Sequence, residues 1–313
     1  MRLLNTRTIE LVEFTPDCIP EYAILSHTWE QGEVLFADLQ HRTEKTKPAW
    51  PKVQSACAQA WADGFGWIWI DTCCIDKSSS AELSEAINSM FTSYASAAVC
   101  YAYLSDVRVW FTRGWTLQEL LAPFEVVFFS RDRVRFGERS SMARILSHVT
   151  QINYKILTHT LPLNSMSIAQ RMSWVARRQT TRPEDMAYCL MGIFSVNMPI
   201  LYGEGGERAF LRLQEEIMKY SEGQTIFAWT DKSAHPSDRY GLLAPSPACF
   251  ADSQDIIAWK QEMDSSPYAM TNRGLPLYLK PLSKFGNRYV RVDIGSLVEA
   301  KIRGLLACGP VQT

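Results

Sequence analysis

Residues 111–123 read Phe111-Thr-Arg-Gly-Trp-Thr-Leu-Gln-Glu-Leu-Leu-Ala-Pro123 and predict a short helix that carries one carboxylate, Glu119. Thr116 lies three residues before Glu119, which is the spacing of a capping box, in which two side chains bond backbone N–H groups of the first helical turn. With Thr116 as the N-cap, Glu119 faces the positive end of the helix, which favours the ionised carboxylate. Pro123 then ends the helix. Glu119 is therefore either a helix cap or a functional group, and its spacing leaves both roles open.

Apolar runs on both sides of this helix predict β-strands. Strands are expected at residues 8–14, 22–26, 67–70, 98–103 and 125–129. Apolar residues at helical spacing predict helices between the last four of these strands. A chain in which strands and helices alternate forms a parallel sheet with helices on both faces. We therefore expect an α/β core over residues 1–135.

Beyond residue 135 the sequence predicts first a helical part and then a β-rich part. Residues 136–223 predict a helical annex, with helices near 142–149, 167–178, 184–194 and 208–220. The capping spacing recurs at Ser79 with Glu82 and at Thr181 with Glu184, and it predicts two more helix starts. Residues 224–313 predict a small β-rich subdomain, because short β-like pieces alternate there with Pro, Gly and Ser. These pieces are residues 225–229, 241–243, 274–279, 289–294 and 300–306.

The composition of the 313-residue chain indicates a folded protein, since 47% of its residues are hydrophobic. The 32 Lys and Arg residues nearly balance the 33 Asp and Glu residues, so no net charge draws the chain to nucleic acid or to an anionic membrane. The longest apolar run, residues 97–104, is too short to span a bilayer, and the N-terminus lacks a signal-peptide pattern. We expect a cytoplasmic protein with no membrane span and no nucleic-acid partner.

The motifs of common nucleotide-binding, metal-binding and hydrolytic sites are absent from the sequence. The eight cysteines form no C-x-x-C pair, so we expect reduced thiols, no bound metal and no resident cofactor. Gly203-Glu-Gly-Gly206 could bind phosphate through its N–H groups, but it lacks a lysine and a preceding strand, so a loop that leads into a helix is expected. Cys74 and His27 could form a nucleophile and its base, although a buried structural thiol is the default role of such a cysteine.

Polar and aromatic residues follow three of the expected strands at their carboxyl ends, where open α/β sheets bind ligands. The candidate substrate-binding residues are Ser26, Trp29, Asp71, Arg113 and Trp115, and the candidate catalytic residue is Glu119. Taken singly, each tryptophan could belong to the core and Asp71 could be a turn or cap residue. Their shared location at one edge of the sheet favours a site.

Three blocks of the sequence resemble the signature blocks of the fungal heterokaryon-incompatibility (HET) domain. They are Tyr22-Ala-Ile-Leu-Ser-His-Thr-Trp29, Trp67-Ile-Trp-Ile-Asp-Thr-Cys-Cys-Ile-Asp76 and Arg113-Gly-Trp-Thr-Leu-Gln-Glu-Leu120. Residues 187–194 and 201–205 resemble the segment that follows this domain in one vegetative-incompatibility subgroup. The resemblance implies a role in non-self recognition, in which fused fungal cells of unlike genotype undergo programmed death. It also implies self-association or an incompatibility partner protein.

A more distant resemblance, to TIR domains, bears on mechanism. Trp115-Thr-Leu-Gln-Glu-Leu120 is similar to the block that holds the catalytic glutamate of NAD-cleaving TIR domains, and Leu25-Ser-His-Thr-Trp29 lies where their first-strand motif lies. The resemblance implies a flavodoxin-like core in which Glu119 cleaves the nicotinamide–ribose bond. NAD is then a substrate and not a cofactor.

The chemistry of that reaction agrees with the residue types. A fixed carboxylate can stabilise the oxocarbenium-like state that forms when the bond breaks. Trp29 or Trp115 could stack on a flat ring, and Arg113 could pair with a pyrophosphate. The alternative is a non-enzymatic death-signalling module that binds a partner protein and uses Glu119 only as a helix cap.

Overall fold

The computed structural model describes residues 1–221, 223–231 and 241–257. Its centre is one seven-stranded sheet in the order β2-β1-β4-β3-β5-β6-β7. The strands are β1 (Arg2–Asn5), β2 (Leu11–Glu13), β3 (Ala23–His27), β4 (Trp67–Trp69), β5 (Val99–Leu104), β6 (Val126–Ser130) and β7 (Arg135–Glu138). All five residues of β3 are buried, as expected of a strand that is covered on both faces. The predicted α/β fold is thereby confirmed.

The four central strands, β4, β3, β5 and β6, run parallel. Numbered along the chain, these parallel strands lie in the order second, first, third, fourth, which is the order of flavodoxin-like sheets. The order reverses between β3 and β5, where Ser26 pairs with Ala102. In such sheets the ligand crevice lies outside the carboxyl ends of the two strands at this reversal.

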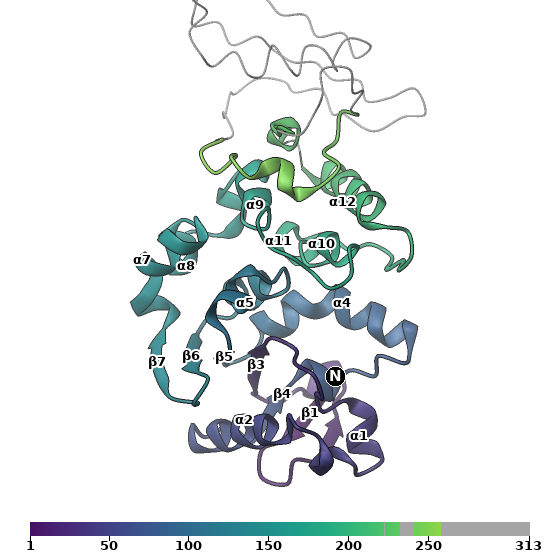
Figure 1. Cartoon of the computed structure of the whole chain (residues 1–313), viewed down its shortest axis with the longest axis vertical. Coiled ribbons are helices and arrows are strands. Elements are labelled where there is room, and N and C mark those ends of the chain that lie inside the picture. The colour runs from purple at the N-terminus through teal and green to yellow at the C-terminus, as the bar shows by residue number, and fades with distance from the viewer. Residues whose placement is uncertain (222, 232–240, 258–313) are drawn as a thin grey trace, which may run out of the picture.

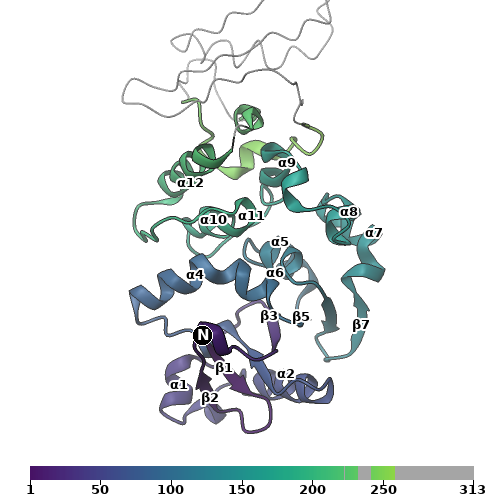
Figure 2. The same cartoon turned by 180° about the vertical axis from the view of Figure 1, so that it is seen from behind.

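Helices cover both faces of the sheet (Figures 1 and 2). On one face lies α2 (Trp50–Ala62). On the other lie α4 (Ser80–Ala95), α5 (Val107–Thr112) and α6 (Thr116–Leu121). The remaining short helices of this part are α1 (Phe36–Gln40), α3 (Asp71–Cys74) and the 3-10 turns η1 (Pro16–Cys18) and η2 (Glu44–Thr46).

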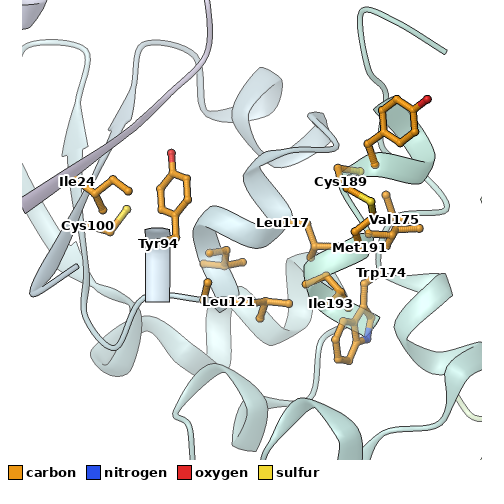
Figure 3. Packing of buried hydrophobic residues seen from close by; sticks show 14 of the residues in the cluster. Ile24, Tyr94, Cys100, Leu117, Leu121, Trp174, Val175, Cys189, Met191 and Ile193 are labelled. Atoms are coloured by element: carbon orange, nitrogen blue, oxygen red, sulfur yellow. The ribbon is translucent and has the colours of Figure 1, made fainter. Parts of the chain in front are cut away.

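The helical annex follows in the chain: its first two helices pack beside β6, β7 and α6, and its later helices form a third layer beyond α4. It consists of α7 (Arg139–Thr150), α8 (Tyr154–Leu157), η3 (Leu163–Ser165), α9 (Ile168–Ser173), α10 (Asp185–Tyr188), α11 (Met191–Phe194) and α12 (Gly206–Tyr220). Figure 3 shows Leu117 and Leu121 of α6 between Ile24 and Cys100 of the sheet and Ile193 of the annex. The annex and the sheet thus share one hydrophobic core, with α6 at its centre.

Some expected elements differ in the structure. The strand predicted at residues 8–14 is shorter, and it forms an antiparallel hairpin with β1, which was not predicted. Ile9 interrupts it, because its φ of 56° is not an extended conformation. The helix predicted at 184–194 breaks at Cys189 and Leu190 into α10 and α11, and the one predicted at 167–178 ends as a regular helix at Ser173.

The predicted β-rich subdomain is wrong where the structure describes it. Residues 225–229 lie mostly in a 3-10 helix, η4 (Gln224–Phe227), which buries Ile226 and Phe227. Residues 241–243 form no strand, and η5 (Pro247–Phe250) follows. The strands predicted at 274–279, 289–294 and 300–306 lie outside the described residues. Across the described part, no helix has the length and apolar character needed to cross a membrane.

Candidate active site

Glu119 and Ser26 meet at the reversal point of the sheet. The Ser26 hydroxyl on β3 donates a hydrogen bond to Oε2 of Glu119 on α6. The same Oγ accepts a hydrogen bond of 2.9 Å from the indole Nε1 of Trp110 on α5. Ser26 and Trp110 are fully buried, and Glu119 is 8% exposed. The indole, the hydroxyl and the carboxyl group therefore form one buried chain of hydrogen bonds.

Glu119 does not cap the helix, so the predicted capping box is wrong. The N-cap of α6 is Trp115, and no side chain accepts a cap hydrogen bond there. The Thr116 hydroxyl instead donates to the carbonyl oxygens of Trp110 (2.5 Å) and Arg113 (2.9 Å). The Glu119 side chain points inward to Ser26 because a buried carboxyl group needs a donor there.

Burial raises the pKa of Glu119 to about 8. The Ser26 hydrogen bond and the charges of Arg113 and Arg178 act in the opposite direction, and the negative charge of Asp71 adds to the rise. The sequence expectation of a carboxylate stabilised by the helix end is therefore wrong, because desolvation dominates. At neutral pH the group is largely protonated, and a nearby cationic ligand would favour its ionised form.

The second oxygen of Glu119, Oε1, accepts no hydrogen bond from any residue in the described part of the chain. Since Oε2 is held by Ser26, a ligand would meet Oε1. The carboxyl group is therefore fixed through Oε2, while Oε1 has no hydrogen-bond partner among the described residues.

Trp29 and Asp71 form a second, more exposed group at the same edge of the sheet. The Trp29 indole Nε1 donates to Asp71 Oδ2 at 2.9 Å, and Lys77 Nζ lies 3.4 Å from the centre of the Trp29 ring. Trp29 is 45% exposed, so it is not a core residue. Asp71 is the first residue of α3 and not its cap. Trp29 thus presents a ring face that already holds a cation.

A cluster of ionisable side chains lies behind this group, and its contacts were not predicted from the sequence. His27 Nε2 lies 3.7 Å from Glu33 Oε2 and 3.9 Å from Asp71 Oδ1. Glu33 also forms a buried ion pair with Lys52. Burial opposes the ionisation of Glu33, but His27 and Lys52 outweigh it and lower the pKa of Glu33 to about 2.

The other two candidates lie apart from this group. The Trp115 indole hydrogen-bonds Asp185 of the annex; burial raises the pKa of Asp185, and this bond opposes the rise. Arg113 pairs its main chain with Gln179 of the annex, and its charge lowers the pKa of Glu119. The structure therefore places Ser26 next to Glu119 and Trp29 next to Asp71. Arg113 is close enough to Glu119 for its charge to act on the carboxyl group. Trp115 points toward the annex.

The structure does not support the two other candidate sites, the pair of Cys74 and His27 and the loop at residues 203–206. Burial raises the pKa of Cys74 to about 12, so its thiol is not a nucleophile at neutral pH. The N–H groups of Gly203 and Gly205 donate to the Glu184 carboxylate at 2.9 and 3.1 Å, so they are not free to bind phosphate. No cluster of His, Cys, Asp and Glu within the described residues could hold a metal ion.

A cavity of about 50 Å³ lies on the opposite face of the sheet. Leu25, Lys52, Tyr101, Tyr103, Phe129 and Arg133 are among its lining residues. Leu25 and Ser26 are neighbours in β3, so their side chains point to opposite faces. The cavity is therefore separate from Glu119.

Comparisons with known proteins cover the blocks that contain Ser26, Trp29 and Asp71, but the family match ends before the block that contains Glu119. The family described as Heterokaryon incompatibility protein (HET) matches residues 22–109, and the Domain of unknown function (DUF8212) matches residues 208–245. The Vegetative incompatibility protein HET-E-1 of Podospora anserina is 47% identical over 244 residues, which cover 70% of this chain and 18% of that protein. The chain thus spans about a fifth of the length of this relative. No solved structure matches the chain.

Proposed function

The chain carries a HET domain, and from this premise we propose that it is an effector of fungal heterokaryon incompatibility and programmed cell death. We propose further that it acts by cleaving the nicotinamide–ribose bond of NAD, with Glu119 as the catalytic carboxylate. The relative that it resembles is named for vegetative incompatibility, which supports the first part. The likeness of the Glu119 block to NAD-cleaving TIR domains supports the second.

One observation carries the enzymatic proposal: Glu119 is held by Ser26 at the reversal point of the sheet and does not cap its helix. A glutamate that capped the helix would hydrogen-bond a backbone N–H of α6. Glu119 instead keeps Oε1 free among the described residues, next to the crevice where sheets of this order bind ligands. Placing a carboxyl group in such a buried position costs stability, and active sites accept this cost.

The reaction needs little besides this carboxylate. The bond between C1′ of the ribose and the ring nitrogen breaks, and its electron pair neutralises the nicotinamide, which leaves without a proton. The positive charge passes to the ribose as an oxocarbenium-like centre, which Glu119 stabilises and water then captures with loss of a proton. Because bound NAD brings a cationic ring, it favours the ionised form of Glu119 that the buried site alone disfavours.

Trp29 fits the recognition of that ring. Its indole is oriented by Asp71, and its face holds the Lys77 ammonium in the structure. A flat cationic ring makes the same type of contact. Arg113 adds a positive charge beside Glu119 that could pair with the pyrophosphate.

A specific observation also supports the non-enzymatic module. The edge strand β7 has a free side within the described sheet, and it exposes Phe136 with Val134 beside it. Apolar residues on a sheet edge suit the binding of a partner protein or of a second copy.

Expression in fungal cells tests the proposal. The wild type should deplete NAD before the cells die, and Glu119→Gln should do neither while it accumulates to the same level. Glu125→Gln, an exposed change a few residues away, is the matched control and should behave as wild type. Killing by Glu119→Gln without loss of NAD would reject the enzymatic proposal and favour the signalling module.

A further inference from the structure

Arg178 of the annex reaches the helix that carries Glu119. Its guanidinium Nη1 donates to the carbonyl oxygen of Arg113 at 2.9 Å and to the Thr116 hydroxyl at 3.0 Å. Its Nε donates to the carbonyl oxygen of Trp174 at 3.1 Å. Arg178 is buried, whereas its neighbour Arg177 is exposed.

No acidic side chain in the described part of the chain forms an ion pair with Arg178. Two of its three partners, the Arg113 carbonyl and the Thr116 hydroxyl, lie at the N-terminal end of α6, where the helix dipole disfavours a cation. Burial lowers the pKa of Arg178 to about 10, which still leaves it charged at neutral pH. Cys189 and, in its ionised form, Glu119 act in the opposite direction and raise the pKa of Arg178. A buried cation in this position costs stability unless a carboxylate compensates for it.

Further bonds hold the same turn from the annex side. Gly114 N donates to Gln179 O at 2.8 Å, and Gln179 N donates to Thr112 O at 2.7 Å. Gln118 Nε2 donates to Cys189 O at 2.6 Å. Helix α6 is thus bound to Ser26 on its inner side and to the annex on its outer side, and Figure 3 shows it between these two layers.

We infer that Arg178 is a positioning residue for Glu119: from the annex it fixes the turn that precedes α6 and places the positive charge that balances the carboxylate. Titratable groups from four other segments also face Glu119. They are Asp71 after β4, Tyr94 of α4, Cys100 of β5 and Arg113 before α6. Arg178 differs from all of these because it comes from the annex, so the site is complete only when the annex is docked.

The test measures the titration of Glu119 itself in the full chain. Glutamate labelled with ¹³C at Cδ gives one carboxyl signal per residue, and the signal that is missing in Glu119→Gln belongs to Glu119. In Arg178→Gln its midpoint should rise, because a charge that lowers the pKa has been removed while an amide donor for the Arg113 carbonyl stays. Arg177→Gln is the matched control and should leave the midpoint unchanged.

Arg178→Lys separates charge from position. It keeps the charge, so the midpoint should stay near that of the wild type. One ammonium nitrogen, however, cannot replace both Nη1, which holds the Arg113 and Thr116 oxygens, and Nε, which holds the Trp174 carbonyl. Turnover of NAD should then fall about tenfold or more through kcat, with KM little changed. An unchanged midpoint in Arg178→Gln, or an equal rise in Arg178→Lys, would overturn the inference.

The turnover part rests on the proposed function, whereas the titration does not. If the wild type releases no nicotinamide, the proposed function fails, and the ¹³C midpoints still decide whether Arg178 balances Glu119.

Discussion

The Ser26 hydroxyl on β3 donates to the Glu119 carboxyl group on α6, across the point where the strand order of the sheet reverses. Because Glu119 bonds Ser26, it does not form the helix cap that the sequence predicts, and its carboxyl group lies in a buried site. The consequences for stability and for ligand binding can be measured separately.

Glu119→Gln should remove a pH dependence of stability. The folded pKa of about 8 lies above the usual value of 4.5 for a glutamate, so the folded protein binds one more proton than the unfolded chain between these values. The stability that protonated Glu119 contributes is present below pH 4.5 and is lost as the pH rises to about 8. The difference in unfolding free energy, wild type minus variant, should fall by up to about 1.4 kcal/mol per pH unit in this window. Urea titrations at several pH values measure it, and parallel curves for the two proteins would contradict it.

Ser26→Ala should destabilise the fold. It leaves the Trp110 N–H and the Glu119 carboxyl group without their shared partner in a buried position. The expected loss is about 1 to 3 kcal/mol of unfolding free energy. Ser80→Ala, at the exposed start of α4, is the control and should change little. Equal stability of the two variants would show that the hydrogen bonds of Ser26 do not contribute to the free energy of unfolding.

Trp29→Ala should weaken substrate binding without unfolding the chain. The loss of a cation–π contact of about 1 to 2 kcal/mol corresponds to a rise in KM for NAD of about tenfold. Trp61 is a matched control, since it is 49% exposed and has the Arg7 guanidinium 4.6 Å from its ring centre. Steady-state kinetics of Trp29→Ala and Trp61→Ala should differ in KM, and the same KM in both would remove Trp29 from the site.

Gly114→Ala should disturb the contact between the annex and α6. A Cβ at this position would lie 2.6 Å from Thr180 Cγ2, so the expected loss is about 1 to 3 kcal/mol. Adding Thr180→Ser removes this methyl group and should restore part of the stability. Gly66→Ala is the control, because a Cβ there meets nothing within 4 Å. Thermal melts that show no rescue by Thr180→Ser would contradict the close packing.

The four parallel strands of the core were predictable because both of their faces are covered, which makes each of them a continuous apolar run. The strands β1 and β7 were missed because they are short and lie outside this doubly covered centre. The candidate site was predictable in part for a related reason. Carboxyl ends of parallel strands share one edge of the sheet, and this brought Ser26 to Glu119 and Trp29 to Asp71.

The capping spacing shows where local rules stop. Of the three places where we predicted it with a glutamate, only Ser79 accepts the expected N–H, from Glu82. Glu119 and Glu184 have stronger partners far away in the sequence, Ser26 for the first and the N–H groups of Gly203 and Gly205 for the second. Trp110 and Arg178 could not be predicted as neighbours of the site, because their contacts depend on how α5 and the annex pack.

The central claim is that Glu119 is a catalytic carboxylate. Its most direct test is nicotinamide release from NAD by the purified chain, in dilute solution and clustered on a support, for wild type, Glu119→Gln and Glu125→Gln, with thermal melts of each. The account predicts release by clustered wild type and Glu125→Gln, and none by a normally folded Glu119→Gln. No release by wild type in either state, or equal release by Glu119→Gln, would contradict it.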